Sequence, residues 1–175
     1  MRENNNEFSA IKKLLGKKFN CLFLQPVSDI LSDVDMFVIN FGKKIEVSLH
    51  IFSLLRIKQG RKILLTGTDY LFGKNYETLT NEQMEKEENN IFKNSLLHQN
   101  IKNVEKILKN ATVVNAYITE VGDVIIEFDN SVTIELLMDA IHDHECYRLI
   151  VFDNHSSQHH IVSYHQGDLI YEAMS

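Results

Sequence analysis

The stretch from residue 124 to residue 136 constrains the fold most, because two runs of alternating apolar residues flank a polar break at Asp129-Asn130-Ser131. Period-two alternation is typical of half-buried strands, and a three-residue break between two such runs predicts a β-hairpin. A two-residue loop would pair apolar with polar residues, so the register is well specified. All six apolar side chains then share one face, as the facing pairs Phe128–Val132, Ile126–Ile134 and Val124–Leu136.

The same pattern occurs earlier, at residues 37–49, with Gly42-Lys43-Lys44 as the break. Aligning the two patterns makes counterparts of Phe41 and Phe128, Ile39 and Ile126, Ile45 and Val132, and Val47 and Ile134. Further along, Leu55-Arg56-Ile57 corresponds to Tyr147-Arg148-Leu149. The repeated order predicts two similar units, residues 1–80 and 81–175, within one compact domain. Each unit is a helix followed by four or five antiparallel strands.

Two helices are expected beside these strands. Apolar residues at helical spacing predict one at residues 8–15. Thr80 and Gln83 form a capping box that predicts the start of a helix over residues 81–109, either continuous or broken near Asn100. The fold class is therefore α+β: antiparallel sheets from two similar halves with helices packed on them. A chain of 175 residues, 44% hydrophobic, suits one sizeable core.

Several features favour a cytoplasmic protein that does not enter a membrane. No apolar run reaches the roughly 20 residues that a membrane-spanning helix needs. The first residues are polar and lack the apolar region of a signal peptide. Cys21 and Cys146 have no CxxC partner, which favours buried thiols in a reducing compartment.

The net charge of −6 hides an asymmetry, because residues 1–75 carry +5 and residues 76–175 carry −11. An acidic surface either keeps a protein soluble or docks a basic partner. We expect a partner-binding acidic face, whose carboxylates would repel the phosphates of nucleic acid. Its candidate residues are Glu120, Asp123, Glu127, Asp129, Glu135, Asp139, Asp143 and Glu145, with Ile125 or Leu137 as an apolar anchor.

Histidines cluster near the end of the chain, where six of the eight lie in residues 140–165. On a strand, His142, His144 and Cys146 would share one face and offer three donors to a metal. Spacing alone supplies neither converging geometry nor a supporting shell, so surface or core histidines are the simpler interpretation. No nucleophile elbow, phosphate-binding loop or HExxH motif occurs, and we expect neither an enzyme nor a cofactor.

Basic residues in the first half are the best candidates for contacting nucleic acid. Those of the first helix alternate with core positions, as solvated residues do, and no aromatic stacking platform lies among the set. We therefore expect no nucleic-acid partner. The residues concerned are Lys12, Lys13, Lys17, Lys18, Lys43 and Lys44.

The order of these segments carries a resemblance. Tyr147-Arg148-Leu149, followed by the turn and apolar-aromatic tail Gly167-Asp168-Leu169-Ile170-Tyr171, resembles a family of small uncharacterised bacterial β-rich proteins with duplicated hairpin units. Such proteins are similar to immunity proteins of bacterial toxin systems. The resemblance implies a protein that binds a cognate toxin and occludes its active face. The acidic charge of residues 76–175 predicts that this toxin is basic. The polar helix at residues 81–100 and the histidine-rich tail depart from the family pattern.

Two other functions remain open from the sequence. The first is a structural or regulatory homodimer that uses an exposed strand edge. The second is a metal-dependent hydrolase built on the C-terminal histidines.

Overall fold

The computed structural model describes residues 9–25, 36–67, 96–138, 144–153, 156–165 and 168–175. Strands dominate these segments, with one short 3-10 helix and one α-helix. In chain order the elements are η1 (Ser9–Leu14), β1 (Phe19–Gln25), β2 (Met36–Phe41), β3 (Val47–Ile51), β4 (Leu54–Gln59), β5 (Lys62–Thr66), α2 (Leu96–Leu108), β6 (Val113–Ile118), β7 (Val124–Phe128), β8 (Val132–Leu137), β9 (His144–Phe152), β10 (Ser157–His165) and β11 (Asp168–Met174).

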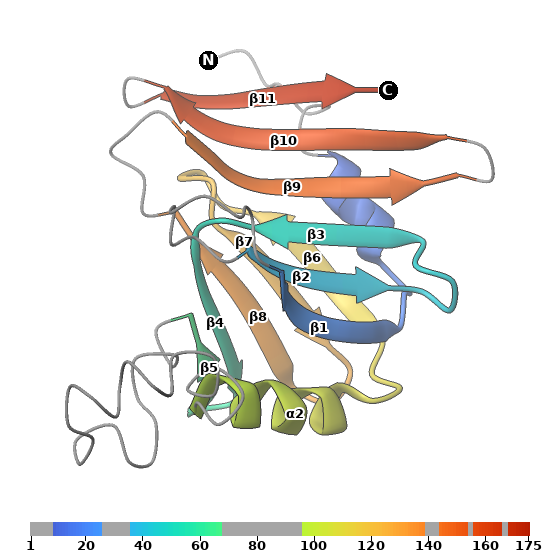
Figure 1. Cartoon of the computed structure of the whole chain (residues 1–175), viewed down its shortest axis with the longest axis vertical. Coiled ribbons are helices and arrows are strands. Elements are labelled where there is room, and N and C mark those ends of the chain that lie inside the picture. Colours follow the sequence, from blue (N-terminus) through green and yellow to red (C-terminus); the bar gives the residue numbers. More distant parts are fainter. Residues whose placement is uncertain (1–8, 26–35, 68–95, 139–143, 154–155, 166–167) are drawn as a thin grey trace, which may run out of the picture.

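The strands form two antiparallel sheets (Figure 1). The six-stranded sheet has the order β1-β2-β3-β9-β10-β11, and the five-stranded sheet has the order β5-β4-β8-β7-β6. A single apolar core lies between the sheets and also takes in residues of both helices. The predicted α+β class, with antiparallel sheets from two similar halves, is confirmed.

The two halves exchange strands. In each half three consecutive strands form a meander, β1-β2-β3 in the first and β6-β7-β8 in the second. The next hairpin of each half then pairs with the other half, so that β4 lies against β8 and β9 lies against β3. Ile57 faces Ile134, and Leu149 faces Leu49. Residues 1–80 and 81–175 therefore each contribute strands to both sheets.

The halves also meet where their first strands begin. Lys18 and Thr112 form an isolated antiparallel bridge that links an edge of one sheet to an edge of the other. Two backbone hydrogen bonds flank this bridge, and each half of the chain donates one of them and accepts the other. They run from the Phe19 N–H to the Ala111 carbonyl (3.0 Å) and from the Val113 N–H to the Lys17 carbonyl (2.9 Å).

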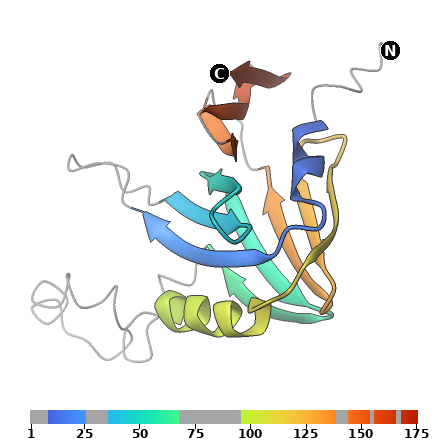
Figure 2. The ribbon, with the colours of Figure 1, turned by 90° about the vertical axis from the view of Figure 1, so that its right-hand side faces the viewer.

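The helices close the ends of the core (Figure 2). Helix α2 lies across β5 and β1, and it buries the apolar stripe Leu97, Ile101, Val104 and Leu108. The Glu105 carboxylate of α2 also accepts a hydrogen bond from the Leu22 N–H at the edge of β1 (3.3 Å). Residues 8–15 were expected to be helical, and the described part of that segment is the 3-10 helix η1. The capping box at Thr80 lies outside the described residues.

Hairpin register was predicted correctly for the second half and wrongly for the first. Val124 faces Leu136 and Ile126 faces Ile134, as expected. In the first half, however, Phe41 faces Val47, two residues beyond the predicted partner Ile45. The reason is a longer loop over residues 42–46, which the Glu46 N–H closes on the Phe41 carbonyl (2.8 Å).

This longer loop changes the counterparts in the two halves. Val47, in place of Ile45, corresponds to Val132, and Leu49, in place of Val47, corresponds to Ile134. The predicted correspondence of Leu55-Arg56-Ile57 with Tyr147-Arg148-Leu149 agrees with the strand pairing. Leu55 faces Leu136, and Tyr147 faces Ile51, which is the counterpart of Leu136 in the first half. Within the described segments, no helix has the length and apolarity to cross a membrane.

Candidate binding surfaces

Glu135 lies on the outward side of the five-stranded sheet, as expected, but it is only 6% exposed. Its carboxylate accepts a 2.5 Å hydrogen bond from Arg56 Nε and forms an ion pair with Lys58. Both cations come from β4, the neighbouring strand. Two basic side chains of the same protein therefore neutralise Glu135, and its contact with a partner stays a prediction.

Most of the other candidate acids on this sheet accept hydrogen bonds from groups of the same chain. The Asp123 carboxylate accepts a hydrogen bond from the Met138 N–H (2.8 Å), and Asp129 accepts one from the Thr112 N–H (3.1 Å). Glu127 is half-buried and accepts a hydrogen bond from the Asn115 amide (3.1 Å). Glu120 is exposed beside the β6–β7 turn. Glu120 and Asp123 precede β7, Glu127 lies within it, and Asp129 follows it.

The last three acids of the candidate set do not extend this surface within the described chain. Glu145 belongs to the six-stranded sheet, where Arg148 clamps its carboxylate through two hydrogen bonds of 2.9 and 2.6 Å. Asp139 and Asp143 lie outside the described residues. Ile125 and Leu137, the expected apolar anchors, are both half-buried. The structure therefore brings together no continuous acidic face from the described members of the set.

The alternative metal site at His142, His144 and Cys146 lacks one accessible donor, the Cys146 thiol. Cys146 is 0% exposed and belongs to the apolar core. A register shift in the pairing of β9 with β10 falls beside it, so simple alternation along β9 fails there. His142 and the side chain of His144 lie outside the described residues. Among the described side chains, no three His, Cys, Asp or Glu residues gather as a metal site would require.

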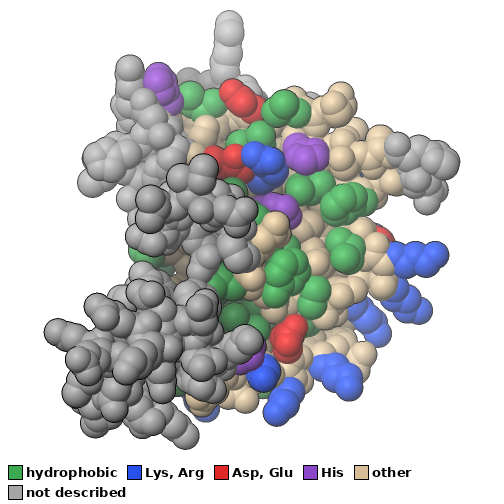
Figure 3. Space-filling model, in the orientation of Figure 1, with side chains coloured by type: hydrophobic (Ala, Val, Ile, Leu, Met, Phe, Trp, Pro, Cys, Tyr) green, Lys and Arg blue, Asp and Glu red, His purple; other side chains and the backbone are tan. Residues whose placement is uncertain are grey.

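A different surface emerges on the outward side of the six-stranded sheet. Strand pairing places its outward side chains in rows that alternate with the core rows. One row contains Phe23, Val38, His50, Arg148, Ile161 and Glu172. The next contains Cys21, Asn40, Ser48, Ile150, His159 and Met174. Figure 3 views this side of the molecule, and apolar side chains occupy its centre.

We call the outward positions of β1, β2 and β3 the uncharged face. None of them is Lys, Arg, Asp or Glu, and Phe23 is 39% exposed. Burial lowers the pKa of His50, and the nearby Arg148 charge lowers it further, so the imidazole is neutral at neutral pH. The face consists of Cys21, Phe23, Gln25, Met36, Val38, Asn40, Ser48 and His50.

Sequence reasoning missed this face, although β2 contained a signal for it. Residues Met36–Phe41 form a nearly uninterrupted apolar run, and all six are buried. An alternating strand has one polar side, whereas an uninterrupted run indicates that both sides are shielded from water. Alternation alone assigns only Phe37, Ile39 and Phe41 to a buried side.

A basic hollow of about 630 Å³ lies where the end of η1, the β2–β3 loop and the end of β9 meet. Lys and Arg side chains gather at the right-hand edge of Figure 3, where Figure 1 places that loop. Lys17 forms an ion pair with Glu46 across the hollow. The lining residues are Lys13, Lys17, Lys43, Lys44, Ile45, Glu46, Val47, Val151, Phe152 and Asp153.

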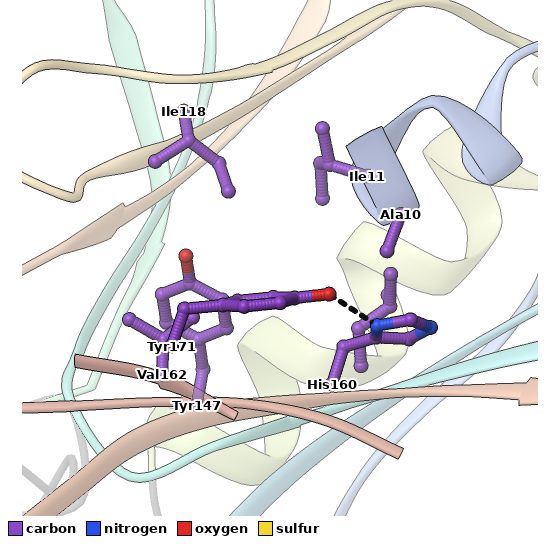
Figure 4. A pocket seen from close by; sticks show the side chains of 8 residues that line it. Ala10, Ile11, Ile118, Tyr147, His160, Val162 and Tyr171 are labelled. Atoms are coloured by element: carbon purple, nitrogen blue, oxygen red, sulfur yellow. Dashed lines mark hydrogen bonds between the residues drawn. The ribbon is translucent and has the colours of Figure 1, made fainter. Parts of the chain in front are cut away.

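A much smaller cavity, about 10 Å³, lies between η1 and the inner side of β9, β10 and β11 (Figure 4). Tyr171 reaches across it to His160, and the hydroxyl is 2.5 Å from the Nδ1 atom. The buried hydroxyl of Tyr147 points toward Ile118 and makes no hydrogen bond with the described residues. The cavity has room for about one water molecule, so it is part of the core and not a ligand site.

Comparison of the chain with protein-family models, with curated proteins and with solved structures finds no match.

Proposed function

We propose that this chain is a protein-binding module of the bacterial cytoplasm, an immunity protein that neutralises a cognate toxin by occluding the toxin's active face. One observation carries the proposal: the eight outward positions of β1–β3 hold no formal charge. The open side of an antiparallel sheet is ordinarily polar and carries charges. Here Phe23 and Gln25 are exposed, Cys21 and His50 are half-buried, and the remaining four positions are buried.

The uncharged face suits a protein partner better than a small molecule. It is the outward side of a sheet, and neither cavity described above opens onto it. Phe23 supplies the aromatic side chain that commonly forms the energetic centre of a protein interface. Polar and charged groups, including the Arg148–Glu145 pair, lie on the adjoining strand β9 and would form the rim.

Charge favours a basic partner. The chain carries a net charge of −6, and its acids concentrate beyond residue 76. Long-range attraction of this kind accelerates the encounter of two proteins without requiring the acids to lie in the interface. A toxin that attacks nucleic acid needs a basic active face, because it must bind phosphates. In this proposal the uncharged face forms the interface and the acids steer the partner toward it.

The test is co-expression with the product of the adjacent gene, followed by growth and pull-down assays. Phe23→Ser should abolish protection and weaken binding by at least about thirtyfold, the loss typical of an interface hot spot. Ile63→Ser is the matched control, because Ile63 is an exposed apolar residue on the other sheet. Equal protection by wild type and Phe23→Ser, or a harmless gene product, would refute the proposal.

Glu120→Lys tests steering separately, since this residue is exposed and makes no contact across the uncharged face. The change should slow association at low salt and leave dissociation unchanged. A change in the dissociation rate would place Glu120 inside the interface.

A second candidate function, a homodimer, is favoured by strand β11. Helix α2 lies against the edge strands β1 and β5, and η1 lies against β6. Strand β11 is the last strand of its sheet: it pairs with β10, and no other described strand pairs with its second edge. Uncovered edges invite pairing with another strand. Light scattering after size exclusion would reveal a dimer, and Ile170→Pro should dissociate it.

A further inference from the structure

The basic hollow concentrates like charges from separate parts of the chain. Lys13 and Lys17 come from the end of η1, and Lys43 and Lys44 come from the β2–β3 loop. Two carboxylates, Glu46 and Asp153, line the same hollow, which leaves a formal charge of +2. The ion pair with Glu46 occupies Lys17. Lys13, Lys43 and Lys44 form no ion pair with another described residue, so their mutual repulsion favours an anionic ligand.

The backbone of the hollow is strained at one residue. Ile45 has a φ angle of +51°, in the left-handed region that β-branched residues avoid. Its side chain is 40% exposed, so core burial does not compensate for the conformation. The corresponding loop of the second half, Asp129-Asn130-Ser131, is two residues shorter. The longer loop therefore places a strained apolar residue in the wall of the hollow, and such strain recurs at binding sites.

An aromatic ring completes the lining. Phe152, at the end of β9, is 42% exposed. Its N–H donates a hydrogen bond to the Glu46 carbonyl (2.9 Å), which fixes this end of β9 against the lysine-bearing loop. The hollow thus combines cationic side chains with the apolar surfaces of Phe152 and Ile45. Its volume lies within the range typical of small-molecule sites.

We infer that the basic hollow binds a small phosphate-bearing molecule with a planar ring, of the mononucleotide class. Lys13, Lys43 and Lys44 provide the charge-assisted hydrogen bonds that a phosphate group accepts. Phe152 and Ile45 provide an apolar surface for the ring. This site is separate from the uncharged face, so its failure would leave the proposed function untouched.

Calorimetric titration with AMP tests the inference on the full-length protein. AMP should bind, and adenosine and inorganic phosphate should each bind at least about tenfold more weakly, because each lacks one half of the recognised chemistry. Added salt should weaken binding of AMP. No heat of binding at millimolar AMP would overturn the inference. Tighter binding of a short single-stranded oligonucleotide than of AMP would also overturn it, in favour of a nucleic-acid site.

Two variants locate the site. The double variant Lys43→Glu/Lys44→Glu should weaken AMP binding by about a hundredfold, roughly tenfold for each charge-assisted hydrogen bond. Lys102→Glu/Lys106→Glu, on the exposed side of α2, makes the same charge change elsewhere and is the matched control. Equal weakening by both double variants would show a general charge effect and exclude the hollow.

Ile45→Gly separates a binding role from a structural one. Glycine adopts positive φ without strain, so the melting temperature should rise. The same change removes an apolar wall, so AMP affinity should fall. A rise in stability with unchanged AMP affinity would show that Ile45 does not contact the ligand and would contradict the proposed arrangement.

Discussion

Phe41 and Phe128 stack on each other in the core, with ring centroids 6.5 Å apart and ring planes inclined by only 14°. They are the last residues of β2 and β7, which hold the same position in the two halves. Phe19 meets Phe128 edge-on at the same centroid distance. The aromatic contact therefore joins the two meanders where the sheets come together, close to the bridge between Lys18 and Thr112.

The stacked pair should be a major source of stability. Phe41→Ala and Phe128→Ala should each lower the free energy of unfolding by about 3–5 kcal/mol, because each leaves a cavity in a closed core. Combined, they should show a coupling energy of about 0.5–1.5 kcal/mol, as expected for aromatic rings in contact. Urea denaturation of the two single variants and the double variant measures both quantities. Strictly additive losses would mean that the stacking contributes nothing beyond burial.

The second hairpin could be predicted from sequence because its loop is short and its polar break is unambiguous. Residues 124–136 allow one register that keeps all apolar side chains on the same face. The first hairpin misled the same reasoning at Ile45. An isoleucine in an alternating run is counted as a strand residue, whereas here it adopts the left-handed conformation within the loop. Nothing in the local pattern distinguishes these outcomes.

The exchange of strands between halves was beyond the reach of a local pattern. Alternation specifies which side of β4 faces the core, but it does not specify whether β4 pairs with β3 or with β8. The same limit applies to the charges of the candidate acids. Glu135 was placed correctly on the outward side, yet its neutralisation by Arg56 and Lys58 depends on the pairing of β4 with β8. Tertiary neighbours decide which charges stay available to a partner.

Glu135 should make the protein sensitive to acid. Burial raises the pKa of its carboxyl, but the hydrogen bonds and charges of Lys58 and Arg56 outweigh that effect and lower the net pKa below the ordinary 4.5. The stabilisation is therefore present above about pH 4.5 and is lost as the pH falls toward the lowered value. Glu135→Gln should cost about 1–2 kcal/mol at pH 7, a modest figure because solvent screens the exposed cations.

Urea denaturation at several pH values checks this prediction. The difference between wild type and Glu135→Gln should shrink on acidification below pH 4.5. Glu127→Gln is the matched control, because that half-buried carboxylate accepts a hydrogen bond from Asn115 and forms no ion pair with another described residue. A constant difference across the pH range would show that the charge of Glu135 is unimportant.

Two histidines with lowered pKa values should cause a separate decrease in the free energy of unfolding at mildly acidic pH. Burial is the main cause that lowers the pKa of both His50 and His160. Arg148 and His159 act in the same direction at His50 and Glu145 opposes them, while His159 and Lys13 reinforce the shift at His160. The unfolded chain then binds more protons than the folded protein, so stability declines as the pH falls below about 6.5.

Thermal melts between pH 7.5 and pH 5.5 measure that decline. His50→Gln and His160→Gln should each reduce the pH dependence. His165→Gln, an exchange at an exposed position of β10, is the control and should leave it unchanged. Identical pH profiles for all three variants would assign the decline to other groups.

Removal of metal ions should leave the fold intact. Cys146 lies within the apolar core, where its thiol packs among hydrocarbon side chains. A structural metal contributes folding free energy directly, so chelation of such a site lowers the melting temperature sharply. The midpoint with and without excess chelator should therefore agree. A drop of many degrees that zinc reverses would instead support the alternative metal site at His142, His144 and Cys146.

The buried hydroxyl of Tyr147 leads to a prediction of opposite sign. The ring is only 2% exposed, and its hydroxyl makes no hydrogen bond with the described residues. Burial raises the pKa of this phenol far above its ordinary value, so it stays protonated at any physiological pH. A buried hydroxyl without a partner costs about 1–3 kcal/mol of desolvation, which phenylalanine avoids. Tyr147→Phe should therefore stabilise the protein or leave its free energy of unfolding unchanged.

The neighbouring Tyr171 provides the contrast. Its hydroxyl meets His160 at 2.5 Å, so Tyr171→Phe removes a formed hydrogen bond and should destabilise the protein by about 1 kcal/mol. Because both changes delete one oxygen beside the same cavity, opposite signs in urea denaturation would separate the two environments. A loss of stability in Tyr147→Phe as large as that in Tyr171→Phe would mean that the cavity holds a water molecule bound to Tyr147. The hydroxyl would then be part of a satisfied network, as buried waters of this kind commonly provide.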